Sequence, residues 1–155
     1  METRETTARN AFKEGYNCSQ CMMVAFADLL GMEKNRALRM ASSLGGGMGR
    51  MREVCGAVSG MFLVAGLLYG YDDPKAYEQK KEHYARIQYL AGKFKEQTGS
   101  IICRELLGTE GKDNSSVPSQ RTETYYKKRP CGDMVGLAAK ILEEYIGEHE
   151  LHAGN

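Results

Sequence analysis

The sequence predicts an all-α protein, a single-domain helical bundle of about six to seven helices over residues 1–155. Two observations lead to this fold class. Apolar residues recur at spacings of three and four and the periodic stretches stop at glycines, while no stretch alternates as a strand would. With 155 residues, of which 42% are hydrophobic and 26% charged, the chain is long enough to bury a core as one globular domain.

The first half of the chain contains three expected helices before a glycine-rich stretch. They cover residues 5–14, 17–30 and 33–44, and the first two stop at a glycine. Asn17 can cap the second helix, and Gln20 stands three residues later, which is the spacing of a capping box. The beginning of this second helix is therefore the best-defined boundary in the first half.

The next helix, over residues 53–69, is the most apolar and is expected at the centre of the bundle. The apolar run is slightly short for a membrane span and carries four glycines, so we expect a buried core helix and no membrane insertion. Its glycines form two pairs with four-residue spacing, Gly56 with Gly60 and Gly66 with Gly70. Such spacing lets another backbone approach closely.

A long helix should begin at Asp73-Pro74 and run to about residue 97. Its expected buried stripe consists of five residues: Tyr77, Tyr84, Ile87, Ala91 and Phe94. The glycine-rich helix and the tyrosines leave enough surface for a homodimer.

The last third of the chain is expected to hold two helices separated by a loop. A short helix covers residues 100–107, a polar loop without periodicity covers 109–129, and the last helix begins at Pro130. A loop of this length is either functional or disordered.

Four of the five cysteines stand at or near expected helix starts, and these four are the candidate site residues: Cys18, Cys55, Cys103 and Cys131. A helix start offers unpaired N–H groups and the positive end of the helix dipole, which favour a thiolate over a thiol. Folding could therefore gather thiolates at one place, for redox chemistry or to hold a metal. A single cysteine is more often a small buried apolar residue, but chance rarely repeats this placement four times.

Basic residues accompany three of these cysteines. Arg50 and Arg52 precede Cys55, Arg104 follows Cys103, and residues 127–129 before Cys131 are all basic. We expect Cys55 to have a lowered pKa and to attack or be oxidised, with another of the four cysteines resolving it. The glycine-rich stretch before Cys55, residues 45–50, matches neither phosphate-binding fingerprint, so a turn that brings two helices and Cys55 close is favoured over an anion cradle.

Two other functions stay open. The same four thiolates are a complete ligand set for zinc or an iron–sulfur cluster, although their wide spacing is unlike a zinc ribbon. The cysteines could instead simply pack inside a non-catalytic helical interaction module.

Cys18 and Cys21 also form a C-x-x-C pair, for which packing and redox roles are equally open. Met22 follows instead of histidine, which excludes c-type haem attachment.

The net charge and the first ten residues limit the classes of protein to which the chain can be assigned. Lys and Arg number 21 against 20 Asp and Glu, so the net charge of +1 gives no indication of nucleic-acid binding. The first ten residues mix acids and bases and lack an apolar segment, so we expect no signal peptide and a cytoplasmic protein. In that compartment the thiols are expected to be reduced, catalytic or metal-bound.

The segment from Gly45 to Gly60 resembles the signature of a family of redox-active proteins named for a C-G-A-x-x-G motif, here Cys55-Gly56-Ala57-Val58-Ser59-Gly60. The resemblance covers about residues 10–146, with Cys18 as the upstream cysteine and Cys103 and Cys131 as the two downstream ones. Cys21 lies outside the shared set. The resemblance implies a small helical protein with four signature cysteines and a redox partner. A related domain in multi-haem cytochromes suggests electron transfer, but no C-x-x-C-H is present here and haem is not implied.

Overall fold

A computed structural model describes residues 2–151 and confirms the all-α fold. Within that range no strand forms, and the β pairing is limited to one isolated antiparallel bridge between Val54 and Ile102. The elements in chain order are α1 (Arg4–Lys13), α2 (Cys18–Ala25), η1 (Ala27–Leu29), α3 (Lys34–Ala41), η2 (Ser42–Leu44), α4 (Gly45–Met48), α5 (Gly56–Tyr69), α6 (Tyr77–Thr98), α7 (Cys103–Leu107), η3 (Gly108–Lys112), α8 (Glu123–Lys128) and α9 (Cys131–Glu148).

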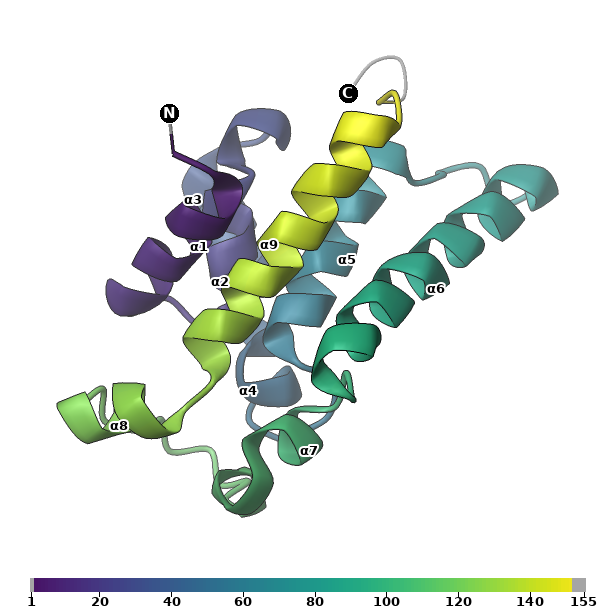
Figure 1. Ribbon diagram of the computed structural model, residues 1–155. Helices are drawn as coiled ribbons and strands as arrows, with labels where there is room; N and C mark the ends of the chain where they lie inside the picture. Colours follow the sequence, from purple (N-terminus) through teal and green to yellow (C-terminus); the bar gives the residue numbers. More distant parts are fainter. Residues whose placement is uncertain (1, 152–155) are drawn as a thin grey trace.

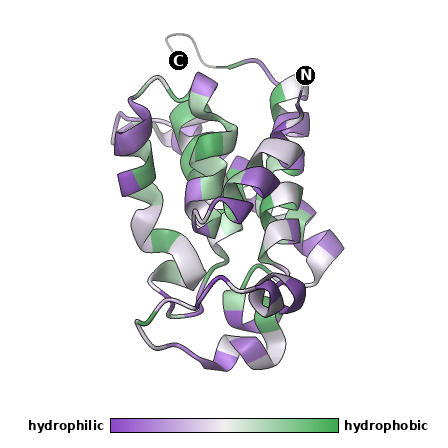
Figure 2. Cartoon of the chain, turned by 90° about the vertical axis from the view of Figure 1, so that its left-hand side faces the viewer, coloured by the Kyte–Doolittle hydropathy of each residue, from purple (hydrophilic) through white to green (hydrophobic). Residues whose placement is uncertain are grey.

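Three helices, α2, α5 and α9, pack against one another at the centre of the bundle, with α1 and α6 on either side (Figure 1). Their inward faces form the hydrophobic core, and its largest fully buried side chains include Phe26, Met61 and Leu142. Apolar residues are concentrated along these inner helices (Figure 2). The three helices begin at the same end of the molecule, where α4, α7 and α8 also lie (Figure 1). The cysteines at the helix starts are thereby directed to one end.

Local sequence explains why α1 and α2 begin where they do. The Thr3 side chain accepts a hydrogen bond from the Thr6 N–H and caps α1. Asn17 caps α2, and Gln20 completes the expected capping box by accepting from the Asn17 N–H at 3.1 Å. This box fixes the position of Cys18, the first residue of α2.

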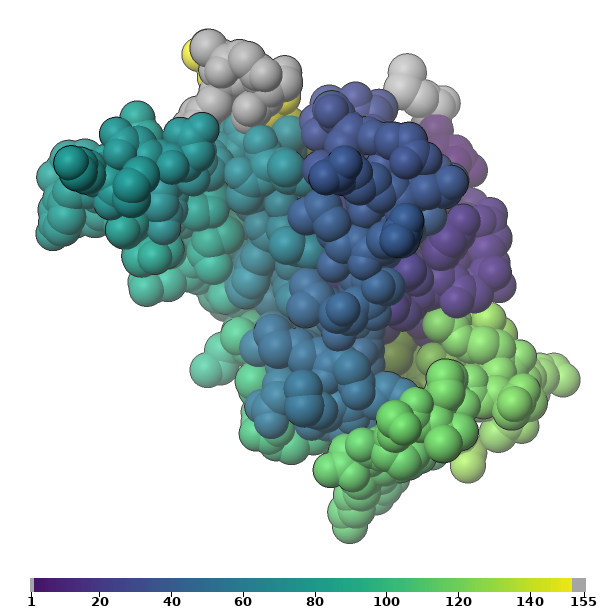
Figure 3. All heavy atoms as spheres, turned by 180° about the vertical axis from the view of Figure 1, so that it is seen from behind, coloured from purple at the N-terminus to yellow at the C-terminus, as the bar shows by residue number. Residues whose placement is uncertain are grey.

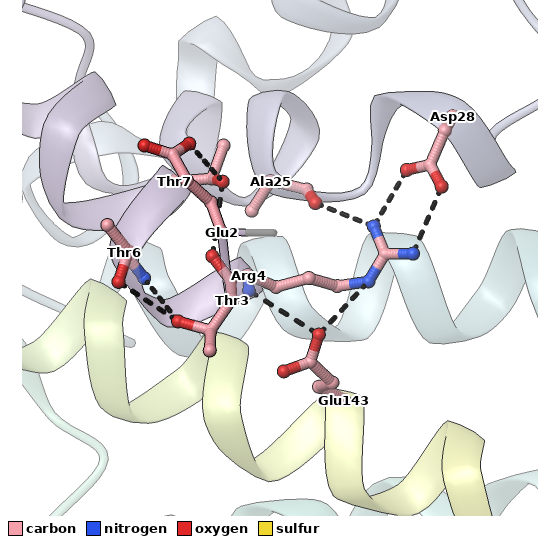
Figure 4. Close-up of polar contacts among 8 residues, drawn as sticks. All are labelled: Glu2, Thr3, Arg4, Thr6, Thr7, Ala25, Asp28 and Glu143. Atoms are coloured by element: carbon pink, nitrogen blue, oxygen red, sulfur yellow. Dashed lines mark hydrogen bonds and ion pairs between the residues drawn. The ribbon is translucent and has the colours of Figure 1, made fainter.

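Arg4 ties α1 to the elements around it (Figure 4). Its guanidinium donates to both carboxylate oxygens of Asp28, at 2.7 and 3.0 Å, and to the Ala25 carbonyl at 2.8 Å. It also pairs with Glu143 of α9 at 3.5 Å. A bidentate pair of this kind gives orientation as well as energy, so Arg4 fixes how α1, α2 and α9 meet at the end opposite the cysteines.

Helix α5 is buried almost all round, as expected of the central helix. Its first glycine pair permits close packing: a Cβ on Gly56 would lie 2.9 Å from Cys18 Cβ, and one on Gly60 would lie 2.9 Å from the Ser19 carbonyl oxygen. The second pair behaves differently, because a Cβ on Gly66 would meet open space. No helix in residues 2–151 is long and apolar enough to cross a membrane.

The structure corrects two expectations about α6. The helix begins at Tyr77, because Ala76 has a non-helical ψ of 73° and Asp73 accepts from the Lys75 N–H in a turn instead of capping the helix. The buried stripe is also different: Phe94 is buried, but Tyr77 and Tyr84 are 70% and 54% exposed.

Polar residues occupy the rest of the buried face of α6. His83 and Arg86 lie on it together with Leu90. Arg86 is accommodated there because its Nε donates to the Tyr145 hydroxyl at 2.8 Å and its guanidinium stacks over the Tyr69 ring. The tyrosine stripe expected from the sequence is therefore wrong.

The segment expected to be a loop, residues 109–129, contains two short helices, η3 and α8. Thr122 caps α8 by accepting from the Tyr125 N–H. The second and third expected helices are also shorter, since each passes into a 3₁₀ turn, η1 and η2. These short pieces lack the apolar periodicity by which longer helices are recognised.

Candidate functional site

The segment labelled α4 is not a regular helix: it belongs to a left-handed turn that connects η2 to the segment carrying Cys55. Five consecutive residues from Gly46 to Arg50 have φ between 58° and 74°, and Arg52 follows with φ 62°. Glycine adopts this conformation freely, but Met48, Arg50 and Arg52 do so at a cost of about 1–2 kcal/mol each. Non-glycine residues in this region mark a backbone held by its surroundings, which is frequent at functional sites.

The turn places the Cys55 segment beside the Cys103 segment. The Cys55 N–H donates to the Ile101 carbonyl at 2.7 Å, and the Cys103 N–H donates to the Glu53 carbonyl at 2.6 Å. Gly47 leaves room for this contact, because a Cβ there would lie 2.6 Å from Cys103 Cβ. The two cysteines thus approach through a short backbone pairing, and the glycine stretch acts as the turn that the sequence favours.

Cys18 and Cys131 are the first residues of α2 and α9. Their side chains lie near enough for each thiol to shift the pKa of the other. Cys18 is 8% exposed, whereas Cys131 is the most exposed of the cysteines. The close approach of α5 at Gly56 holds Cys18 from behind.

All four candidate cysteines line one cavity of about 500 Å³. Four arginines line it with them, Arg50, Arg52, Arg121 and Arg129. From behind, the segment of residues 110–130 lies against the segment containing α4, and the surface is hollowed where they meet (Figure 3). The four cysteines that the sequence singles out therefore lie on the walls of the same cavity.

Cys18 and the nearby arginines give Cys131 the most acidic thiol of the five cysteines. The interaction with the Cys18 thiol, followed by the positive charges of Arg129, Arg121 and Arg52, lowers the pKa of Cys131 to about 7 although burial opposes this. The same interaction, with burial, raises the pKa of Cys18 well above its ordinary value. When the pair loses its first proton, the negative charge therefore resides on Cys131.

The expected lowering of the Cys55 pKa is wrong. Burial raises the pKa of Cys55 to about 12, and the Ala57 and Val58 amides at the start of α5 offset this only in part. Burial also raises the pKa of Cys103, against the favourable contact of Arg52. The helix-start argument fails at Cys55 because the loss of water outweighs the local amides.

The arginines near the site are not arranged as their sequence positions suggest. Arg52 Nη1 lies 3.8 Å from Cys103 Sγ. Arg52 therefore contacts the sulfur of Cys103, although in the chain it precedes Cys55. Arg104 is half exposed and pairs with Glu53 at 3.2 Å. Adjacency in sequence is therefore a poor guide to the cation that faces each sulfur.

Arg121 is a site residue that the sequence does not reveal. It stands in the polar segment without periodicity, and its donors bond to the Phe12 and Tyr16 carbonyls at 2.9 and 3.0 Å. Its guanidinium stacks 4.3 Å from the Phe12 ring centroid and 5.0 Å from that of Tyr125. No local motif indicates this position, because the partners come from distant elements.

Cys21 lies outside the cavity. It is fully buried, its sulfur faces the Tyr16 carbonyl at 3.7 Å, and burial raises its pKa to about 12. Of the two roles left open for the C-x-x-C pair, the structure favours packing for Cys21.

The donor geometry does not match a metal centre. A zinc ion needs its ligands within bonding reach of one point. Among residues 2–151 no three or more Cys, His, Asp or Glu side chains form a group that could hold a metal ion. The zinc or iron–sulfur site considered from the sequence is thus not preformed by these side chains.

The fold and the site define a class: an all-α protein with cysteines from four separate elements around a cavity lined by arginines. Residues 16–145 match the model of a family described as "Putative redox-active protein (C_GCAxxG_C_C)", and the chain belongs to that family. Comparisons with curated proteins and with solved structures give no match. The family label orders its central box as G-C-A-x-x-G, whereas the chain reads Cys55-Gly56-Ala57.

Proposed function

We propose that the protein is a thiol–disulfide oxidoreductase in which Cys131 is the nucleophile and Cys18 the resolving thiol. One observation carries the proposal: these two cysteines, from opposite ends of the sequence, line one cavity and act on each other's pKa, so that the more acidic thiol is that of Cys131.

The reaction consists of two exchanges. The Cys131 thiolate attacks one sulfur of a substrate disulfide, forms a mixed disulfide and releases the other half as a thiolate. Cys18 then loses its proton and attacks the Cys131 sulfur, which releases the second half as a thiolate. The substrate disulfide gains two electrons, and the protein is left with a Cys18–Cys131 disulfide.

Cys131 suits the attacking role because its pKa of about 7 is close to neutral pH. An attacking thiol works best there, since a lower pKa weakens the nucleophile and a higher one reduces the thiolate fraction. Its exposure also exceeds that of Cys55, so a substrate can reach it. A buried thiol with a pKa of about 12, such as Cys55, meets neither requirement.

Cys55 and Cys103 complete the proposed set as a second pair. They line the same cavity, and the backbone pairing at residues 53–55 and 101–103 holds their segments together. We assign them the receiving role, in which they exchange with the Cys18–Cys131 disulfide and regenerate the first pair. The raised pKa values keep them as thiols until that step.

The test is to oxidise the fully reduced protein with a neutral disulfide, bis(2-hydroxyethyl) disulfide, and to map the linkages by mass spectrometry. The expected first product links Cys18 to Cys131. Cys131→Ser should abolish the reaction, while Cys18→Ser should stop it at the mixed disulfide on Cys131. Cys21→Ala, outside the cavity, is the matched control and should react normally.

Metal analysis and a visible spectrum of protein purified without oxygen separate this function from the metal alternative. Colourless, metal-free protein that reacts as described supports thiol chemistry. Stoichiometric iron or zinc released together with loss of structure would overturn it, as would attack at Cys55 in place of Cys131.

A further inference from the structure

The cavity is strongly and one-sidedly charged. Four arginines line it, and none of the described residues that line it is Asp or Glu. Two of these guanidiniums are compensated from outside, Arg50 by Asp113 at 3.3 Å and Arg129 by Glu110 at 3.6 Å. The other two, Arg52 and Arg121, form no ion pair with a carboxylate among residues 2–151. Two positive charges thus stand around the cavity without a carboxylate partner, and the Cys131 thiol offsets them only when it is ionised.

Arg52 is the clearer case, because it is only 3% exposed. Its Nε donates to the Asp113 carbonyl at 2.9 Å and its Nη1 to Cys103 Sγ at 3.8 Å, while Nη2 has no hydrogen-bond partner within the described structure. A buried charge without a counter-ion is costly. The backbone carrying it is also left-handed. A residue kept here at such cost points to an anion that joins it in the working state.

Arg121 is held by a different set of contacts from Arg52. Its hydrogen bonds reach only backbone carbonyls, and aromatic rings flank its guanidinium. These contacts fix the plane of the group but do not cancel its charge, and Arg121 also lowers the pKa of Cys131. Arg121 and Arg52 therefore both act on the Cys131 sulfur.

The size and the walls of the cavity suit a small organic molecule. A volume of about 500 Å³ lies within the range of small-molecule sites. Phe12, Leu106 and Met134 supply apolar wall, and the N-terminal ends of α2, α5 and α9 add positive potential.

We infer that the cavity binds a small organic anion bearing a disulfide, whose carboxylate or similar group is held by Arg52 and Arg121. This inference rests on the proposed function for its chemistry but not for its binding. The Cys131 thiolate attacks the bound disulfide, one half leaves as an anionic thiolate, and the other remains on Cys131 until Cys18 displaces it. The bound disulfide is the oxidant and is reduced by two electrons to two anionic thiols.

Binding is tested without thiol chemistry in a Cys18→Ser/Cys131→Ser protein. The probe is adipate, the carbon isostere of dithiodiglycolate; adipamide and 1,6-diaminohexane are its neutral and cationic counterparts. Titration followed by NMR should show that adipate alone binds with shifts around the cavity. Arg52→Met and Arg121→Met should each weaken binding about tenfold or more, whereas Arg36→Met on exposed α3 should not. Equal binding of the diamine, or no binding of adipate, overturns the inference.

Chemistry is tested with three disulfides of matched length: dithiodiglycolate, bis(2-hydroxyethyl) disulfide and cystamine. In the unaltered protein the anionic disulfide should react fastest and cationic cystamine slowest. Arg52→Met also removes a charge that favours the thiolate, so all three rates fall; recognition is read from the ratio of the anionic to the neutral rate. If Arg52→Met does not fold, the ratio of the anionic to the neutral rate is compared between Arg121→Met and the unaltered protein, and this comparison still tests the inference.

The two proposals fail in different ways. Equal rates for the three disulfides without adipate binding would leave the thiol reaction standing and remove the anion site. Adipate binding without reaction of any disulfide would leave the anion site standing and remove the oxidoreductase.

Discussion

Cys18 and Cys131, the first residues of α2 and α9, line the same cavity, and each thiol shifts the pKa of the other. Each helix presents its sulfur at its positive end, which favours a negative charge there. Cys18, followed by Arg129, Arg121 and Arg52, favours that charge on Cys131, the more accessible of the two. Acidity and access thereby coincide on one residue.

The alkylation rate of Cys131 should rise with pH and level off above about 7, because its pKa is lowered to about 7 and only the thiolate reacts. Cys18→Ala removes the largest cause of this lowering, so the midpoint should move up toward the ordinary thiol value and the rate at pH 7 should fall several-fold. Iodoacetamide labelling resolved by peptide mass spectrometry measures both. An unchanged midpoint in Cys18→Ala would show that the arginines alone set the acidity.

Cys21 should be the slowest cysteine to react with iodoacetamide in the folded protein. Its side chain is completely buried and its pKa is raised to about 12, so the thiolate is scarce and inaccessible. The measurement is the ratio of its labelling rate in native protein to that in denaturant. Rapid native labelling at Cys21 would mean that α2 opens locally, and protection of Cys131 to the same degree would contradict the assignment of the nucleophile.

Two glycines of α5 should respond to alanine with opposite signs. Gly60→Ala would place a Cβ 2.9 Å from the Ser19 carbonyl oxygen and should destabilise the protein by about 1–3 kcal/mol, since the helices must separate. Gly66→Ala meets open space and should stabilise it by about 0.5–1 kcal/mol through helix propensity. Urea unfolding gives both values. Equal effects would contradict the close packing of α2 on α5.

The segment over the cavity should loosen in acid at an unusually low pH. Hydrogen bonds from Ser115, followed by Arg50, lower the pKa of Asp113 to about 2. A carboxyl group whose pKa is lowered by folding stabilises the fold above its unfolded pKa of 3.8, and this contribution disappears as the pH falls through about 2. The Ser115 amide shift followed by NMR should show a midpoint near 2. Asp113→Asn should remove the step; a midpoint near 4 would show that the contacts do not persist in solution.

Much of the fold is predictable because the signals are local. The capping box of Asn17 and Gln20, the apolar run of α5 and the glycine stops require only neighbours in sequence. The tyrosine stripe predicted for α6 is wrong because the burial of residues on that helix depends on partners in other helices. Burial of Arg86 depends on a hydrogen bond to Tyr145, and the sequence of α6 alone does not contain that partner.

The candidate site shows the same contrast between features that depend on neighbours in sequence and features that depend on remote residues. The four cysteines could be selected because helix starts are visible in sequence, but their ranking could not be predicted. The Cys131 pKa depends on Cys18 and Arg121, which are remote in sequence, and the Cys55 pKa depends on burial. Nothing near Arg121 distinguishes it from the other basic residues of a polar segment.

The left-handed run before Cys55 also bears on how the protein could be engineered. Glycine at Met48 or Arg50 would relax a backbone that L-amino acids resist, so selection for heat resistance alone should enrich glycine at these positions. The same change would give Arg52 more freedom next to the sulfurs. A library screened only for melting temperature would then favour more stable variants in which the position of Arg52 is less fixed.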